Sequence, residues 1–178
     1  MHTVSYTGKI LFEPENKTKK HLAQASWKKV AMVIFEGDIA EYYSWFLERR
    51  FGIELNKPLR GAHVTFINDS MNDLNAANGS EEKSEKAWED LKAKWDGKEI
   101  DVTLNLRPFS DDNHWWLIVD HNHRQGLHNI RAEIGLEKPY FGLHLTMGYV
   151  NERNLDHSKY INMLNEKGFT EINKDYGK

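Results

Sequence analysis

Hydrophobic residues fall into short runs that predict strands, separated by polar segments. The segment Lys29–Phe35 holds the longest apolar run and has the length and composition of a buried central strand. In Gly61–Ile67, apolar side chains alternate with His63 and Thr65, as in a strand with one buried face. Further strands are predicted over Tyr6–Phe12, Ile100–Leu106, Trp115–Val119 and Gly142–Val150. A polar turn separates the second and third of these, so we expect them to form a hairpin.

Helices are predicted where apolar residues recur every three or four positions. Asp38 and Glu41 have the spacing of a capping box, and the helix that follows is expected to end at Gly52. The segment 68–80 is rich in Asn, Asp, Ser and Gly, which predicts a loop. Three more helices are indicated by Trp88, Leu91 and Trp95 within Glu81–Asp96, by Leu127, Ile130 and Ile134 before Gly135, and by Tyr160, Met163 and Leu164 before Gly168.

This order of strands and helices predicts an α+β fold with a mixed or antiparallel sheet and helices on its outer side. A length of 178 residues predicts a single domain, spanning residues 1–178. The chain has no cysteine, which excludes disulfides, a thiolate zinc site and a cysteine nucleophile.

The charge of the chain narrows the possible partners. A formal net charge of -3 argues against a long nucleic acid, because proteins that follow a phosphate backbone are usually basic. A small anionic ligand remains possible, since a few local donors can bind it. No apolar run approaches the ~18 residues of a membrane span, and Met1–Lys9 lacks a signal-peptide pattern. We therefore expect a cytoplasmic protein with no membrane partner and no obligatory protein partner.

Two predicted strands carry the same pattern of residues. Gly61–Phe66 and Gly142–Met147 both read Gly, apolar, His, apolar, Thr, apolar. Side chains alternate along a strand, so His63 and Thr65 share one face, as do His144 and Thr146. If the two strands lie near one another, two imidazoles and two hydroxyls converge in one concavity. The alternative is two polar faces turned toward solvent, which leaves the matched glycines and the matched spacing unexplained.

Two histidines and two hydroxyl donors suit phosphodiester chemistry. A neutral imidazole can accept a proton from a hydroxyl nucleophile, and a protonated imidazole can donate one to the leaving oxygen. Thr65 and Thr146 can donate hydrogen bonds to the non-bridging phosphate oxygens. The sequence contains neither an H-E-x-x-H motif nor a glycine-rich phosphate loop, so we expect no metal and no cofactor.

These paired H-x-T motifs resemble those of the 2H phosphoesterase superfamily, over roughly residues 29–150. The resemblance implies a LigT-like fold, in which sheets form a concave cleft and helices pack on the outer side. It also implies that His63 and His144 act as acid and base, that Thr65 and Thr146 hold the phosphate, and that no metal takes part. Within the superfamily, three segments are similar to the phage anti-CBASS phosphodiesterases: WKKVAMVIFEGDIAEYYSWFLERRFG, LNKPLRGAHVTFIND and KPYFGLHLTMG.

The resemblance implies a metal-independent hydrolase that cleaves 3′–5′ bonds of cyclic di- and trinucleotide messengers such as cGAMP. Cleavage would let a phage evade CBASS-type immunity in the cytoplasm of its bacterial host. Two alternatives stay open. One is a 2′,3′-cyclic phosphodiesterase or ligase acting on RNA ends or on 2′–5′ oligonucleotides. The other is a protein that sequesters a cyclic nucleotide without cleaving it.

Other residues are weaker candidates. Six could bind substrate, one by its charge and five through their rings: Arg60, Trp95, Trp115, Trp116, Tyr140 and Phe141. Adjacent Trp115 and Trp116 must point to opposite faces of a strand, and the sequence does not decide which one meets a ligand. A histidine-rich cluster is more simply explained as solvated side chains near a helix start than as a metal site: His114, Asp120, His121, His123 and His128.

Overall fold

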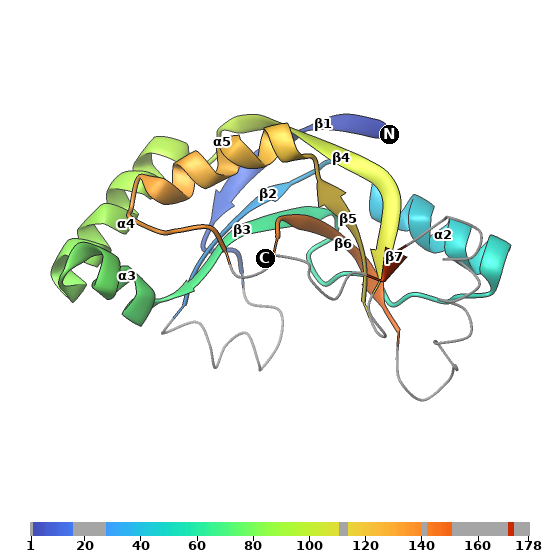
Figure 1. Cartoon of the computed structure of the whole chain (residues 1–178), viewed down its shortest axis with the longest axis horizontal. Helices are drawn as coiled ribbons and strands as arrows, with labels where there is room; N and C mark the ends of the chain where they lie inside the picture. The colour runs from blue at the N-terminus through green and yellow to red at the C-terminus, as the bar shows by residue number, and fades with distance from the viewer. Residues whose placement is uncertain (1, 16–27, 111–113, 140–141, 151–170, 173–178) are drawn as a thin grey trace.

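The computed structural model describes residues 2–15, 28–110, 114–139, 142–150 and 171–172. Its strands are β1 (Thr3–Phe12), β2 (Lys28–Ile34), β3 (His63–Ser70), β4 (Glu99–Ser110), β5 (His114–Val119), β6 (His144–Tyr149) and β7 (Glu171–Ile172). Its helices are α2 (Ile39–Phe51), α3 (Met71–Asn78), α4 (Glu81–Trp95) and α5 (His121–Ala132). Helices α3 and α4 lie at one end of the molecule and α2 at the other (Figure 1). Over the described ranges, no helix is both long enough and apolar enough to cross a membrane.

The strands β1 to β6 form a closed antiparallel barrel. Their order is β1-β2-β3-β6-β5-β4, and β4 also pairs with β1. Strand β1 makes both closing contacts, because Thr3–Lys9 pair with β4 and Lys9–Phe12 pair with β2. The short strand β7 pairs with β4 in parallel.

The expected α+β fold, with LigT-like sheets that form a concave cleft and helices on the outer side, is therefore wrong. The pairing of β1 with β4 instead closes β1 to β6 into one barrel. This pairing joins distant parts of the sequence, as the 2.6 Å contact between Ser5 Oγ and Thr103 Oγ1 illustrates. Hydrophobic periodicity locates each strand but carries no information about such a distant partner, so the sequence pattern could not reveal the closure.

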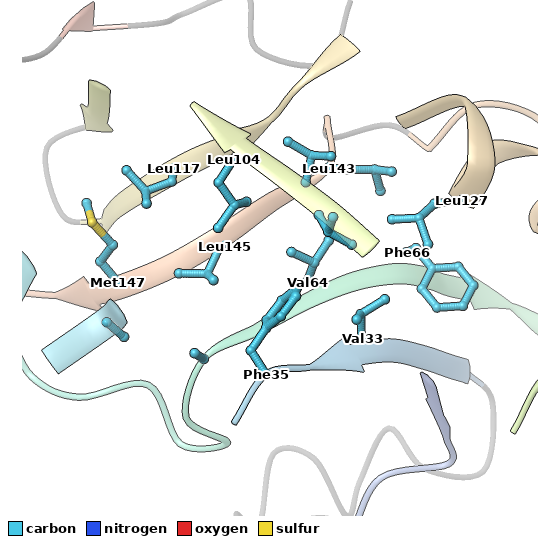
Figure 2. Packing of buried hydrophobic residues seen from close by; sticks show 14 of the residues in the cluster. Val33, Phe35, Val64, Phe66, Leu104, Leu117, Leu127, Leu143, Leu145 and Met147 are labelled. Carbon is cyan, nitrogen blue, oxygen red and sulfur yellow. The ribbon is translucent and has the colours of Figure 1, made fainter. Parts of the chain in front are cut away.

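The main hydrophobic core collects side chains from one face of every barrel strand and from all four helices. The strands contribute, among others, Ile10, Val33, Val64, Leu104, Leu117 and Leu145. Figure 2 shows Val64, Leu104 and Leu145 pointing toward one another between the ribbons. The helices add, among others, Leu47, Leu74, Trp88 and Leu127. Because the core takes one face of each strand, side chains at alternate positions of β3 and β6 are turned away from it.

The predicted strands and most predicted helices are confirmed, with ends shifted by up to four residues. The hairpin is also confirmed, as β4 and β5 pair antiparallel. The predicted loop over 68–80 is wrong: β3 runs to Ser70, and α3 follows at once. Ser70 and Asp73 form a capping box, in which each side chain accepts a hydrogen bond from the other residue's backbone N–H. Polar residues interpreted as a loop signal thus belong to a helix start.

Helix α2 and its end at Gly52 are confirmed, but its predicted capping box is wrong. The Asp38 side chain makes no capping hydrogen bond. Instead, the carboxylate of Glu41 accepts a hydrogen bond from Lys57 Nζ at 2.7 Å. The Glu41 side chain is thus directed to Lys57 and not to the N–H groups at the helix start. The helix predicted around residues 160–164 lies outside the described residues.

Gly8 should be important for packing where β1 exchanges partners, because the side chains of Val33 and Phe35 lie against it. A Cβ at this position would overlap Val33 and lie 2.8 Å from Phe35 Cε1. We expect Gly8→Ala to destabilise the protein by about 1–3 kcal/mol, as overpacking of a core does. Urea unfolding followed by tryptophan fluorescence measures this change.

Gly126 in α5 provides the matched control, since a Cβ there meets nothing within 4 Å. Gly126→Ala should stabilise the protein by about 0.5–1 kcal/mol, because glycine is a poor helix former. Equal stability of Gly8→Ala and the unaltered protein would contradict the close packing of Val33 and Phe35 against Gly8.

Candidate functional site

The two H-x-T motifs lie on neighbouring strands. Strand β3 pairs antiparallel with β6 through Val64 and Leu145, both of which are fully buried in the core. The residues on either side of each therefore point away from the core. In this register, His63 lies across from Thr146, and Thr65 lies across from His144. The structure thus brings the four predicted catalytic residues together on one face of the sheet.

Each histidine makes the same hydrogen bond to its own strand. His63 Nδ1 lies 2.9 Å from the carbonyl oxygen of Gly61, and His144 Nδ1 lies 2.7 Å from that of Gly142. A carbonyl can only accept, so both Nδ1 atoms carry a proton. In each neutral imidazole, the lone pair is therefore on Nε2. The glycine of each motif thus holds its histidine in the Nδ1–H tautomer.

The turn before β3 explains why glycine occupies position 61. Gly61 has φ +68°, a left-handed conformation that side-chain-bearing residues rarely adopt. Its N–H donates to the carbonyl of Pro58 at 3.2 Å, which closes a turn, while its own carbonyl accepts from His63. Local sequence chemistry therefore sets the orientation of the first imidazole.

Burial lowers the pKa of both histidines below the ordinary value of 6.5. At His63, the hydrogen bond to Gly61 opposes this shift and the charge of Arg60 adds to it. At His144, the bond to Gly142 likewise opposes it, and the charges of His63 and His114 add to it. A positive charge on His63 therefore disfavours protonation of His144.

Apolar side chains flank the polar residues on both sides. On β2, Ile34 lies opposite His63 and Met32 lies opposite Thr65. On β5, Ile118 lies opposite His144 and Trp116 lies opposite Thr146. Directly opposed residues of an antiparallel pair share a face, so the histidines and threonines occupy a polar strip between two apolar strands.

The apolar flank on the β5 side is a small hydrophobic cluster separate from the main core, formed by Phe109, Trp116 and Ile118. The ring of Trp116 meets that of His144 edge to face, with 6.2 Å between the centroids. Of the two adjacent tryptophans, Trp116 is therefore the one on the histidine face, whereas Trp115 belongs to the main core. The structure thus distinguishes two residues that the sequence left equivalent.

Arg60 lies near the histidine pair. Its charge contributes to the lowered pKa of His63, and its Nη2 donates to the backbone oxygen of Glu15 at 3.2 Å. Its Nε is buried without a hydrogen-bond partner. A guanidinium in this position could meet a phosphate oxygen, so Arg60 stays a predicted substrate-binding residue.

The structure does not bring Trp95 to this face. Its ring packs against the main core, and its indole N–H donates to the Glu133 carboxylate at 3.3 Å. Tyr140 and Phe141, the two remaining predicted substrate-binding residues, lie outside the described residues.

The histidine-rich segment around α5 contains no metal site within the part of the chain that the structure describes, since no three His, Asp or Glu side chains gather there. Asp120 instead caps α5, with its carboxylate accepting from the N–H of Asn122 at 3.1 Å. The charge of His114, at the start of β5, contributes to the lowered pKa of His144.

Sequence reasoning missed Met32, Ile34, Phe109 and Ile118 as neighbours of the motifs. Their patterns predict strand residues, but only the pairing of β2, β4 and β5 within the barrel brings them to the histidine face. Sequence reasoning also missed that the carbonyls of Gly61 and Gly142 orient the two histidines. The sequence does contain a sign of this role, since a glycine precedes each histidine by two positions.

In comparisons with protein-family models, with curated proteins and with solved structures, nothing matches this chain. The functional interpretation therefore depends on the geometry of the site and on the resemblance of its motifs.

The site presents two Nε2 atoms, which can each accept or donate a proton, beside two hydroxyls. Within the described residues, neither threonine hydroxyl has a hydrogen-bond partner, so both are available to a ligand.

The lowered pKa values predict how stability depends on pH. A folded-state pKa below the unfolded value near 6.5 gives stability that is fully present above pH 6.5. This stability is lost as the pH falls through the folded-state pKa. Urea unfolding at a series of pH values should show this loss of stability. In His144→Gln, the loss between neutral and acidic pH should be smaller.

Coupling of the pair predicts a further shift. His63→Gln removes a positive neighbour and should raise the pKa of His144, measured from its imidazole Cε1–H resonance. The exposed control His121→Gln should leave that resonance unchanged. An unchanged pKa of His144 in His63→Gln would show that the imidazoles are too far apart to act on one phosphate.

Proposed function

We propose that this protein is a phosphodiesterase that cleaves 3′–5′ bonds of small cyclic oligonucleotides, with His63 and His144 as its acid and base. One observation carries the proposal: the two imidazoles lie on adjacent antiparallel strands, each is held through Nδ1 so that the lone pair of its neutral form is on Nε2, and each faces a threonine. A site that only binds a ligand needs no such matched pair of proton-transfer groups.

The reaction follows from the positions of these groups. The Nε2 lone pair of one histidine accepts the proton of the ribose 2′-hydroxyl, and O2′ attacks the adjacent phosphorus. The bond from phosphorus to O5′ breaks, and O5′ takes a proton from Nε2–H of the other histidine. The product ends in a 2′,3′-cyclic phosphate, which water opens when the two histidines exchange roles.

Charge develops on the non-bridging phosphate oxygens as the bond forms. Thr65 and Thr146 supply hydroxyl donors to these oxygens, and Arg60 supplies a positive charge near His63. Because both histidines have a lowered pKa, the state with one proton on the pair is most populated below pH 6.5. The proposal therefore places the activity optimum on the acidic side of neutrality.

The substrate class is proposed from the resemblance of the motifs to 2H phosphoesterases, most closely the phage anti-CBASS enzymes. The barrel is not the fold that this resemblance implies, so the proposal depends on the site and not on the fold. The apolar strands beside the polar strip also favour a ligand that carries rings on both sides of a phosphate, as a cyclic dinucleotide does.

Single substitutions test the assignment of acid and base. His63→Ala and His144→Ala should each lower kcat by about 10²–10⁴-fold, because each removes one proton-transfer group. Thr65→Val and Thr146→Val should cost about 1–3 kcal/mol each in transition-state stabilisation, as single lost donors. The assay is chromatography of cyclic dinucleotides after incubation with each variant.

Two exposed residues away from the site serve as controls, His121→Ala on α5 and Thr7→Val on β1, and both should retain full activity. Turnover in His63→Ala equal to that of the unaltered protein would refute the assignment. Intact cyclic dinucleotide that co-elutes with the protein would instead support a sequestering function.

The nucleophile is tested with a cyclic dinucleotide that contains only 2′-deoxyriboses. It should bind and resist cleavage, because a 2′-hydroxyl held beside phosphorus replaces a bimolecular step with an intramolecular one. Cleavage of the ribose form should persist in EDTA, since imidazoles supply both proton transfers. Rapid cleavage of the deoxy ring would show that water attacks directly.

A further inference from the structure

Helix α5 carries a buried arginine with an unusual set of partners. The side chain of Arg131 is 2% exposed. Its Nη1 and Nη2 donate to the two carboxylate oxygens of Asp69 at 2.6 and 3.0 Å, which makes a bidentate ion pair. Nη1 also donates to the backbone oxygen of Phe66 at 2.8 Å, and Nε donates to that of Glu137 at 2.8 Å.

These partners belong to the two segments that carry the histidines. Phe66 and Asp69 lie on β3, shortly after His63 and Thr65. Glu137 precedes β6 in the chain, as does Gly142, whose carbonyl holds His144. One guanidinium therefore connects the strand of the first motif with Glu137, seven residues before the second histidine.

The direct contact between the two strands is short. Within the described residues, Val64 and Leu145 are the single pair of Cα partners between β3 and β6. In contrast, β3 pairs with β2 over Lys28–Ile34, and β6 pairs with β5 over His114–Ile118. A junction held by so few strand hydrogen bonds leaves room for another contact to fix the relative position of its two sides.

The far end of α5 is itself held in place. The side chain of Asn78 in α3 donates to the backbone oxygens of Leu74 at 2.9 Å and Ile134 at 3.1 Å, which connects α3 with the residues after α5. Arg131 is thus attached to a fixed support, and its planar fork imposes a direction as well as a distance on its partners.

We propose that Arg131 is a positioning residue for the proposed reaction: its guanidinium fixes β3 against Glu137, which precedes β6 in the chain, and so helps to set the distance between His63 and His144. The inference rests on the proposed function for its catalytic consequence, but the geometric claim can be tested without any substrate. Lysine cannot replace arginine here, because an ammonium lacks the fork that reaches a carboxylate and two carbonyls together.

The first experiment measures electrostatic coupling between the imidazoles by NMR. The shift in the His144 titration caused by His63→Gln is determined in the unaltered protein and again in Arg131→Lys. We expect this shift to fall by about half in Arg131→Lys, since the interaction of two charges weakens as they separate. A purely structural role for Arg131 would leave it unchanged.

The second experiment measures cleavage of a cyclic dinucleotide. Arg131→Lys should lower kcat by about 10–100-fold and change KM by less than about threefold, because misplaced catalytic groups slow the chemical step. Leu91→Ala, which removes a core side chain of α4 that makes none of these hydrogen bonds, is the matched control for lost stability. It should keep both kcat and the coupling at their original values.

Asp69→Asn provides a second variant if Arg131→Lys fails to fold, because it leaves the bonds of Arg131 to Phe66 and Glu137 available. It should reduce kcat and the coupling in the same direction by smaller factors. Folded variants that are less stable but keep full coupling and full kcat would overturn the proposal. If the unaltered protein cleaves no cyclic dinucleotide, the proposed function fails, and the coupling measurement still decides whether Arg131 positions the histidines.

Discussion

Strand β1 pairs with β2 along one edge and with β4 along the other, and this double pairing closes the barrel. The exchange of partners occurs near Gly8, where β1 passes too close to Val33 and Phe35 for any side chain. Every barrel strand then has two neighbours, so each has one face on a common core and one face away from it. The position of the histidines follows from this division of faces.

The closed sheet determines on which face the two H-x-T motifs lie and which residues surround them. Because β3 and β6 are adjacent in the barrel, β2 and β5 become their outer neighbours and bring apolar side chains to both flanks of the polar strip. Partial burial in these surroundings lowers the pKa of both histidines. The same strand order therefore links the packing of the barrel with the proton chemistry of the site.

Two levels of structure hold the imidazoles. Hydrogen bonds to the carbonyls of Gly61 and Gly142 set the tautomer and the direction of each ring, and these bonds depend on only three consecutive residues. The distance between the rings depends instead on contacts between elements, among them the four hydrogen bonds of Arg131. Local and tertiary contacts thus control different properties of one site.

The sequence by itself determined the strands, most of the helices and the shared faces of His63 with Thr65 and of His144 with Thr146. Alternation along a strand is a local property, so a single chain displays it. Only the tertiary structure decided that β3 and β6 are neighbours, that Trp116 and not Trp115 lies beside His144, and that the sheet closes. The physical reason is that strand pairing satisfies backbone hydrogen bonds, which are the same for every residue type except proline. Their partners are therefore chosen by the packing of the whole chain, and not by any residue pattern within one strand.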